Sequence, residues 1–248
     1  MTAIFKMELI KNAQDKGLYF WTFVLPIIFM IMFISIFTSG TMADSKDQVI
    51  LSIVPGYTVM FVFFIMISMC FSFIKDNENG MIARLASTPL PSYSYLMGKW
   101  MTYMIIVMIQ IMVMFIFGKV VYNIPLEQPI FLLFLAIILT LSITGMGVAL
   151  SLIVRTANMG IAITQVITFS GAVIGGLWMP LEMMPGIIQK IGKFTPQYWA
   201  HDAFKQAMSG ILSFTDLLMS SLILLGFGCT GFLIAWISFP RFLNRAKS

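Results

Sequence analysis

The chain has 248 residues, of which 59% are hydrophobic and only 10% are charged, and its mean hydropathy is +0.95. A water-soluble domain of this length cannot bury so much apolar surface, so the composition excludes one and indicates an integral membrane protein. The formal net charge of +5 then reports orientation in the membrane rather than a nucleic-acid partner, because Lys and Arg gather on the cytoplasmic side.

The N-terminal segment, residues 1–16, mixes apolar side chains with Lys6, Lys11 and Lys16. This pattern predicts a helix that lies in the membrane interface with its lysines towards the lipid phosphates. The apolar segment that follows, 18–37, is too long for the core of a signal peptide and has the length of a membrane span. Pro26 lies early in this span, where it can kink the helix.

Six apolar segments are long enough to cross a bilayer as helices. They cover residues 18–37, 49–74, 97–117, 130–154, 161–179 and 217–239. Between the fifth and sixth spans, residues 181–215 predict an external cap of two short amphipathic helices at the membrane surface, broken at Thr195-Pro196, and Pro240 closes the last span. The predicted fold is therefore an all-α integral membrane protein whose single transmembrane domain covers 1–248.

A polar stretch, 75–92, interrupts the apolar sequence between the second and third spans. Met81 to Leu85 reads as one or two turns of amphipathic helix, and Pro89 and Pro91 stop it, since proline lacks an N–H group and disfavours helix in the preceding residue. The stretch is thus a short, stiff element hung between two spans. Such an element is suited to transmit force between the membrane domain and a partner outside the bilayer.

Charge is distributed unevenly over the loops. With six spans both termini lie on one side, and the segments on that side hold ten basic and four acidic residues, against five basic and six acidic residues on the other. The positive-inside rule therefore places both termini and the 75–92 stretch in the cytoplasm, and the 181–215 segment outside.

The sequence lacks the patterns of an enzyme site. His201 stands beside Asp202, but neighbours on a helix do not face each other, so an exposed polar pair is expected. No cluster has metal-ligand spacing, and no Gly-Lys pair is followed by Ser or Thr as in a phosphate-binding loop. We therefore expect no catalytic residue, metal or cofactor in this chain. The span centres hold essentially no ionisable groups, which disfavours an ion-driven carrier and requires energy from a partner.

One combination of motifs resembles a known family. It consists of Glu78-x-Gly80-x-x-x-Arg84-Leu85-x-Ser87-x-Pro89-Leu90, then Tyr95-Leu96-x-Gly98-Lys99, and after the fifth span Pro180, Met184-Pro185 and Thr195-Pro196-x-Tyr198. Together with the order of spans, the pattern is similar to the permease subunit of type-2 ABC exporters over essentially the whole chain.

The resemblance implies a permease that pairs with a second copy or a sister permease and binds two copies of a separate ABC ATPase, which would hold ATP and Mg. It also implies that the stretch after the second span is a coupling helix that docks into the ATPase. The residues that would carry this coupling are Asp76, Glu78, Gly80, Met81, Arg84, Leu85 and Pro89. The expected location is the cell membrane, with multiple spans and both termini cytoplasmic.

A path between two such subunits would be apolar, which favours export of a hydrophobic or amphipathic cargo such as a drug, a lipid-like antibiotic or a membrane-active peptide. Candidate path residues are Phe64, Met66, Phe71, Phe169 and Trp178, for each of which packing in the core is the simpler interpretation. Export of a polysaccharide or lipid, a membrane sensing or immunity subunit that transports nothing, and a secondary carrier stay open as alternatives. An adjacent reading frame with a GxxxxGK[ST] motif would favour the exporter.

Overall fold

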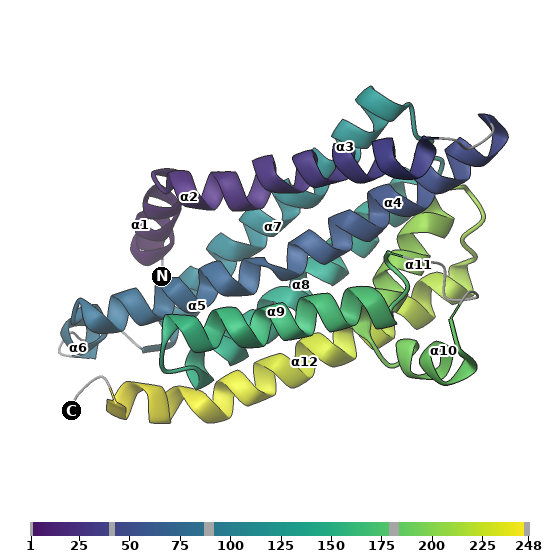
Figure 1. The fold of residues 1–248 in the computed structure, drawn as a ribbon. Coiled ribbons are helices and arrows are strands. Elements are labelled where there is room, and N and C mark those ends of the chain that lie inside the picture. Colours follow the sequence, from purple (N-terminus) through teal and green to yellow (C-terminus); the bar gives the residue numbers. More distant parts are fainter. Residues whose placement is uncertain (1, 40–42, 87–91, 179–183, 246–248) are drawn as a thin grey trace.

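The computed structural model describes residues 2–39, 43–86, 92–178 and 184–245, which form a bundle of helices (Figure 1). Within these residues six helical runs are long and apolar enough to cross a membrane: 16–38, 46–78, 93–122, 129–153, 157–174 and 214–243. The predicted all-α fold with six spans is thus confirmed.

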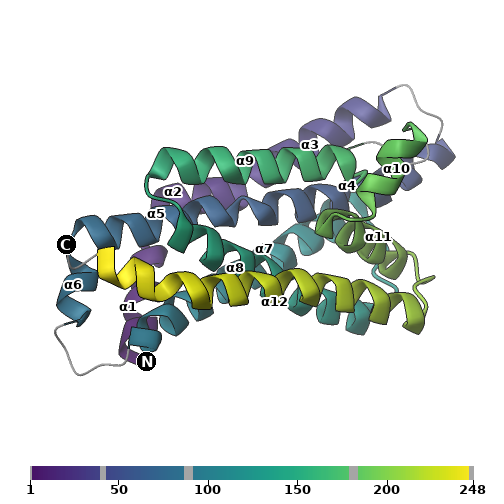
Figure 2. The same cartoon turned by 90° about the horizontal axis from the view of Figure 1, so that it is seen from below.

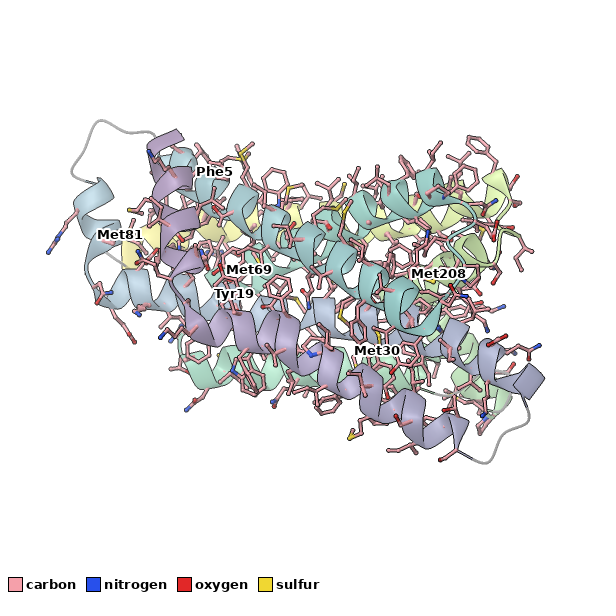
Figure 3. All side chains as sticks on the ribbon, turned by 90° about the horizontal axis from the view of Figure 1, so that it is seen from above. Phe5, Tyr19, Met30, Met69, Met81 and Met208 are labelled. Atoms are coloured by element: carbon pink, nitrogen blue, oxygen red, sulfur yellow. The ribbon has the colours of Figure 1, made fainter. Side chains whose placement is uncertain are left out.

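The helices follow one another along the chain with these bounds: α1 Thr2–Ala13, α2 Lys16–Tyr19, a π-helical turn Phe20–Val24, α3 Leu25–Thr38, α4 Ala43–Phe63, α5 Ile65–Glu78, α6 Met81–Ala86, α7 Ser92–Tyr122, α8 Pro129–Ile153, α9 Ala157–Ile174, α10 Gly186–Gly192, α11 Pro196–Met208 and α12 Phe214–Arg245. Helices α1 and α6 lie with both ends of the described chain at one end of the bundle, called here the α6 end, and α10 and α11 lie at the other (Figures 1 and 2). Helix α1 lies across the α6 end rather than along the bundle. The labelled side chains of Phe5 and Met81 mark this end, and Met208 the opposite one (Figure 3).

The first span is one continuous helical run that contains a wide turn. Residues Phe20–Val24 are π-helical and end two positions before Pro26, which lies in the first turn of α3. A proline ring cannot donate a backbone hydrogen bond and clashes with the carbonyl one turn earlier, and a π-helical turn gives that carbonyl room. The sequence predicts a kink at Pro26, and the structure has a wide π-helical turn before the proline.

The closest packing in the bundle joins α8 to α12. The second half of α8 is rich in small residues and meets glycines of α12. A Cβ on Gly145 would lie 2.8 Å from the Gly228 carbonyl oxygen, and a Cβ on Gly231 would lie 2.6 Å from the Gly145 carbonyl carbon. Backbones approach this closely only where side chains are absent, and in lipid such contacts hold helices together through van der Waals attraction.

Two predicted boundaries differ from the structure. Helix α9 ends at Ile174, because Gly176 adopts a φ of 76° and the Leu177 N–H donates to the Ala172 carbonyl at 2.9 Å, which closes the helix in a Schellman motif. Helix α12 passes through Pro240 and continues to Arg245, since neighbouring helices can compensate a proline inside a membrane helix. Pro180 and the start of the predicted cap lie outside the described residues.

The cap segment contains α10 and α11 on either side of Thr195, whose hydroxyl accepts a hydrogen bond from the Tyr198 N–H and caps α11. Helix α11 buries one face in the bundle, while Lys205 on another face is exposed. Ala200, Ala203 and Phe204 are almost completely buried, and the helix packs among α4, α8 and α12.

The interpretation of His201 as an exposed residue was therefore wrong. Its ring is buried beside α4, where Nε2 lies 3.0 Å from the Ser52 carbonyl oxygen and carries the proton that this contact needs. Gly56 makes room for the ring, because a Cβ there would lie 3.4 Å from Nε2. Burial lowers the pKa of His201 from its usual 6.5 to about 4, so the imidazole is neutral over most of the accessible pH range.

The contact between α8 and α12 can be tested with alanine. In Gly231→Ala the new Cβ meets backbone atoms that cannot turn away, so we expect a loss of about 1–3 kcal/mol in the free energy of unfolding, measured by SDS titration in mixed micelles. In the matched control Gly226→Ala, a Cβ meets nothing within 4 Å, and the better helix propensity of alanine gains up to about 1 kcal/mol. Equal losses in the two variants would contradict this packing.

The burial of His201 predicts a pH dependence. Because its folded-state pKa is depressed, the unfolded chain binds the proton more readily, so stability is complete above pH 6.5 and falls as the pH drops towards 4. In His201→Gln the amide can still donate to Ser52 but does not titrate. We expect the wild type to lose up to about 3 kcal/mol relative to this variant between these pH values. Parallel stability profiles would show that the ring is not desolvated in the folded protein.

Candidate functional site: a long groove beside a buried ion cluster

A groove of about 980 Å³ runs along the bundle between the first span, the α4–α5 run and α9. One stripe of α4 and α5 lines it with residues three or four apart, the spacing of a single helical face: Tyr57, Met60, Phe61, Phe64, Ile67, Ser68, Phe71, Ser72 and Lys75. From Tyr57 to Lys75 this stripe is about 27 Å long at the rise of an α-helix. The groove therefore extends through most of the thickness of a bilayer core.

Aromatic side chains form the wall of the groove. The rings of Phe64 and Phe169 lie 5.5 Å apart between centroids, and those of Phe169 and Trp178 lie 6.1 Å apart. The Trp178 indole N–H also donates to the Met60 sulfur at 3.1 Å. These contacts link α5 to α9 and to the turn that follows α9.

Four of the five residues predicted for a cargo path, namely Phe64, Phe71, Phe169 and Trp178, line this groove. The fifth, Met66, does not. It is 1% exposed and faces α8, where a Cβ on Gly147 would come within 3.4 Å of its Cγ. The simpler interpretation, packing in the core, describes Met66.

The groove ends in polar side chains near the α6 end of the bundle. Lys11 and Lys75 bring positive charge, and Ser72 brings a hydroxyl group. Asp15 also lines this end, but its carboxylate accepts hydrogen bonds from the Gly17 and Leu18 N–H groups and so caps α2.

A buried ion cluster lies next to this polar end. The ammonium group of Lys99 is 2.6 Å from Asp76 Oδ2 and 3.3 Å from Glu8 Oε2, and it donates to the Ser72 hydroxyl. Lys11 lies 2.6 Å from the other Asp76 oxygen. The Tyr95 hydroxyl donates to Asp76 Oδ2 at 3.0 Å. The cluster thus joins two carboxylates to two ammonium groups.

The surroundings of Lys99 explain how a charged side chain can be buried. Its exposed fraction is 0%, and besides its carboxylate partners it meets the rings of Phe73 and Tyr95 at 5.0 and 5.5 Å from their centroids. An aromatic face attracts a cation, and the partner charges balance it. The cluster fastens α1 to α5 and α7, because Glu8, Asp76 and Lys99 lie on these three helices.

Close backbone packing supports the same junction. A Cβ on Gly98 would lie 2.8 Å from a side-chain carbon of Ile4, so the absence of a side chain at Gly98 lets α1 approach α7. Ile4 itself is buried in that contact. The crosswise position of α1 is therefore fixed both by charge pairing and by contact (Figures 1 and 3).

The predicted coupling residues occupy different environments. Gly80 adopts a φ of 66° in the turn between α5 and α6, a backbone conformation that favours glycine. Glu78 and Arg84 are exposed and Met81 is half-buried. Asp76 faces inward and belongs to the ion cluster, and Ile82, 1% exposed, anchors α6. Leu85 lies in α6, its side chain is not described, and Pro89 lies outside the described residues.

Sequence reasoning did not identify Glu8 and Lys99 as partners. Lys99 entered the motif Tyr95-Leu96-x-Gly98-Lys99, and both residues entered the count of charges on one side of the membrane. A signal was present, since each stands within an apolar stretch where an unpaired charge would be costly. Within the part of the chain that the structure describes, no group of three or more His, Cys, Asp or Glu side chains could hold a metal ion.

The ion cluster predicts a large effect of removing Lys99. In Lys99→Met two buried carboxylates lose their shared partner, so we expect a loss of about 3–5 kcal/mol in the free energy of unfolding. The matched control Lys119→Met removes an exposed lysine of the same helix and costs less than about 0.5 kcal/mol. The measurement is SDS titration in mixed micelles, and similar values for both variants would contradict the cluster.

Comparison with known proteins agrees with this architecture. The family model described as ABC-2 family transporter protein matches residues 44–237. The linearmycin resistance permease protein LnrN of Bacillus subtilis (strain 168) is 23% identical over 199 residues, which cover 79% of this chain and 52% of LnrN. The putative transport permease YvfS of the same organism is 25% identical over 203 residues, 77% of this chain and 78% of YvfS.

A third relative is the ABC transporter G family member 20 of Dictyostelium discoideum, 24% identical over 141 residues that cover 55% of this chain and 19% of the relative. The chain therefore spans about half the length of LnrN and most of YvfS. The family model covers more than half of the chain and includes five of its six spans. The chain belongs to the ABC-2 family of transporter proteins.

Proposed function

We propose that this protein is the permease subunit of an ATP-driven ABC exporter that moves a hydrophobic or amphipathic cargo out of the cell. The observation that carries the proposal is the long groove with its aromatic wall, which contains four of the residues expected on a cargo path. Membership of the ABC-2 family and similarity to two permeases support it.

The energy for transport would come from a separate subunit. None of the three Gly-Lys pairs of the sequence is followed by Ser or Thr, as a phosphate-binding loop requires. We therefore propose two copies of an ABC ATPase, which hold ATP and Mg, and a second copy of this chain or a sister permease. The family supports an ATPase partner in general terms.

The α6 end is the proposed contact with the ATPase. Its charge supports a cytoplasmic position in the cell membrane, because the segments of that end hold ten of the fifteen basic residues of the chain. Exposed Arg84 and Glu78 offer charged contacts there, and buried Ile82 fixes α6 to the bundle. A displacement of α6 would be transmitted through the turn at Gly80 to α5, and from α5 to the ion cluster.

The cargo class is proposed from the groove and from one relative. The wall is aromatic and apolar and includes the flexible side chain of Met60, which suits an apolar ligand. LnrN is named as a permease for resistance to linearmycin, which supports an antibiotic-like cargo for this chain as well. A sensing or immunity subunit without transport would need no groove through the bilayer core.

Arg84→Glu tests the coupling role. The permease would be co-purified with its ABC ATPase, and ATP hydrolysis and ATP-dependent efflux of amphipathic compounds would be measured in reconstituted vesicles. Because Arg84 is exposed and lies in α6, we expect the variant to fold but to lose stimulation of the ATPase by at least about tenfold.

The matched control is Lys119→Glu, which makes the same charge change at an exposed position towards the opposite end of the bundle. This control should keep full stimulation. Stimulation that is unchanged in Arg84→Glu would rule out the contact between α6 and the ATPase. Transport of a compound by the permease alone would rule out ATP hydrolysis by a partner as the energy source.

A further inference from the structure

The two ends of the groove differ in chemistry. Towards the α6 end it is lined by the ammonium groups of Lys11 and Lys75, and further along only apolar and aromatic side chains and a few hydroxyl or amide groups line it. Lys11 is already committed to Asp76 at 2.6 Å. Lys75 is exposed and forms no ion pair with any described residue. A cation at one end of an apolar groove is complementary to an amphiphile with an acidic head group.

The ring of Tyr57 lines the deeper part of the groove. Tyr57 is 2% exposed, and its hydroxyl group has no hydrogen-bond partner among the residues that the structure describes. Its ring is held in place by Phe33, 4.9 Å away between centroids. The hydroxyl oxygen is fully buried, so the groove meets the ring of Tyr57 and not its hydroxyl group.

We propose that the groove binds an acidic amphiphile, taken from the membrane leaflet at the α6 end, whose carboxylate or phosphate lies at Lys75 and whose apolar chain lies along the stripe towards Tyr57. The length of about 27 Å between these residues exceeds one leaflet of a bilayer core, about 15 Å, so a complete acyl chain fits beside the aromatic wall. The ring of Tyr57 belongs to the apolar wall along which this chain lies.

This inference deepens the proposed function and rests on it for the assignment of the groove to cargo. It narrows the cargo from amphipathic compounds in general to those with a negative head group. Lys11 contributes less than Lys75, because its charge is balanced by Asp76.

The test uses the purified full-length permease in neutral detergent without ATPase. The probes are stearic acid with a nitroxide near the end of its chain and the methyl ester of the same compound. The measurement is the immobilised fraction of the electron paramagnetic resonance signal, at alkaline pH where the free acid is ionised. We expect the acid to bind about fivefold more tightly than the ester, the effect of one lysine on an anionic head group.

Variants separate the head-group contact from the apolar wall. Lys75→Gln should abolish the preference for the acid and leave binding of the ester unchanged, which also shows that the variant is folded. The matched control Lys119→Gln, an exposed lysine of α7 that does not line the groove, should keep the preference. Tyr57→Phe should leave the affinities for the acid and the ester unchanged, because the buried hydroxyl group does not face the groove.

Several results would overturn the inference. Equal affinity for acid and ester, or a preference that survives Lys75→Gln, would remove the head-group site. Displacement of the acid by inorganic phosphate would mean that Lys75 binds soluble anions and not the head group of an amphiphile. A dimer from which the probe is excluded would assign the groove to a second copy of the chain. Since no ATPase is present, these results are independent of the Arg84 experiment, and either proposal can fail alone.

Discussion

The position of the N-terminal helix depends on one buried cation. Lys99 holds Glu8 of α1 and Asp76 of α5 in one cluster, and with its partners it connects three helices. In lipid there is no hydrophobic force between helices, so a buried charge pair is a stronger constraint on their arrangement than further leucines would be. The cluster therefore fixes the positions of the side chains at the polar end of the groove and of the end of α5 that leads to α6.

Most of the fold could be predicted from the sequence because the bilayer permits few alternatives. A long apolar run must satisfy its backbone internally and therefore forms a helix, which is why all six spans were found. The apolar surroundings of Glu8 and Lys99 indicate that each needs a partner, but the two residues are 91 positions apart, and no local pattern shows which residues pair. The burial of α11 escaped for a similar reason. An amphipathic pattern shows that a helix has two faces, but it does not show what covers the polar one.

The candidate site was predictable in part. Helical spacing could have distinguished Met66 from the other candidates. Phe64 and Phe71 are one heptad apart and share a helix face with Tyr57 and Lys75. Met66 is two residues from Phe64 and so lies on a different face, towards α8. Which face borders a groove and which meets a neighbour is decided by the whole bundle. Asp76 illustrates the same limit, because a single sequence does not distinguish an exposed aspartate in a loop from one that belongs to a buried ion cluster.

The wide turn at Phe20–Val24 has a mechanical consequence. It stores one residue more than an α-helical turn would hold, and Trp21, which borders the groove, lies within it. Rewinding this turn into an α-helix would rotate the part of the chain on one side of it by about 100° against the other, without breaking the span. The first span therefore contains a turn about which the helix on one side of the groove could rotate while α1 stays paired with Lys99.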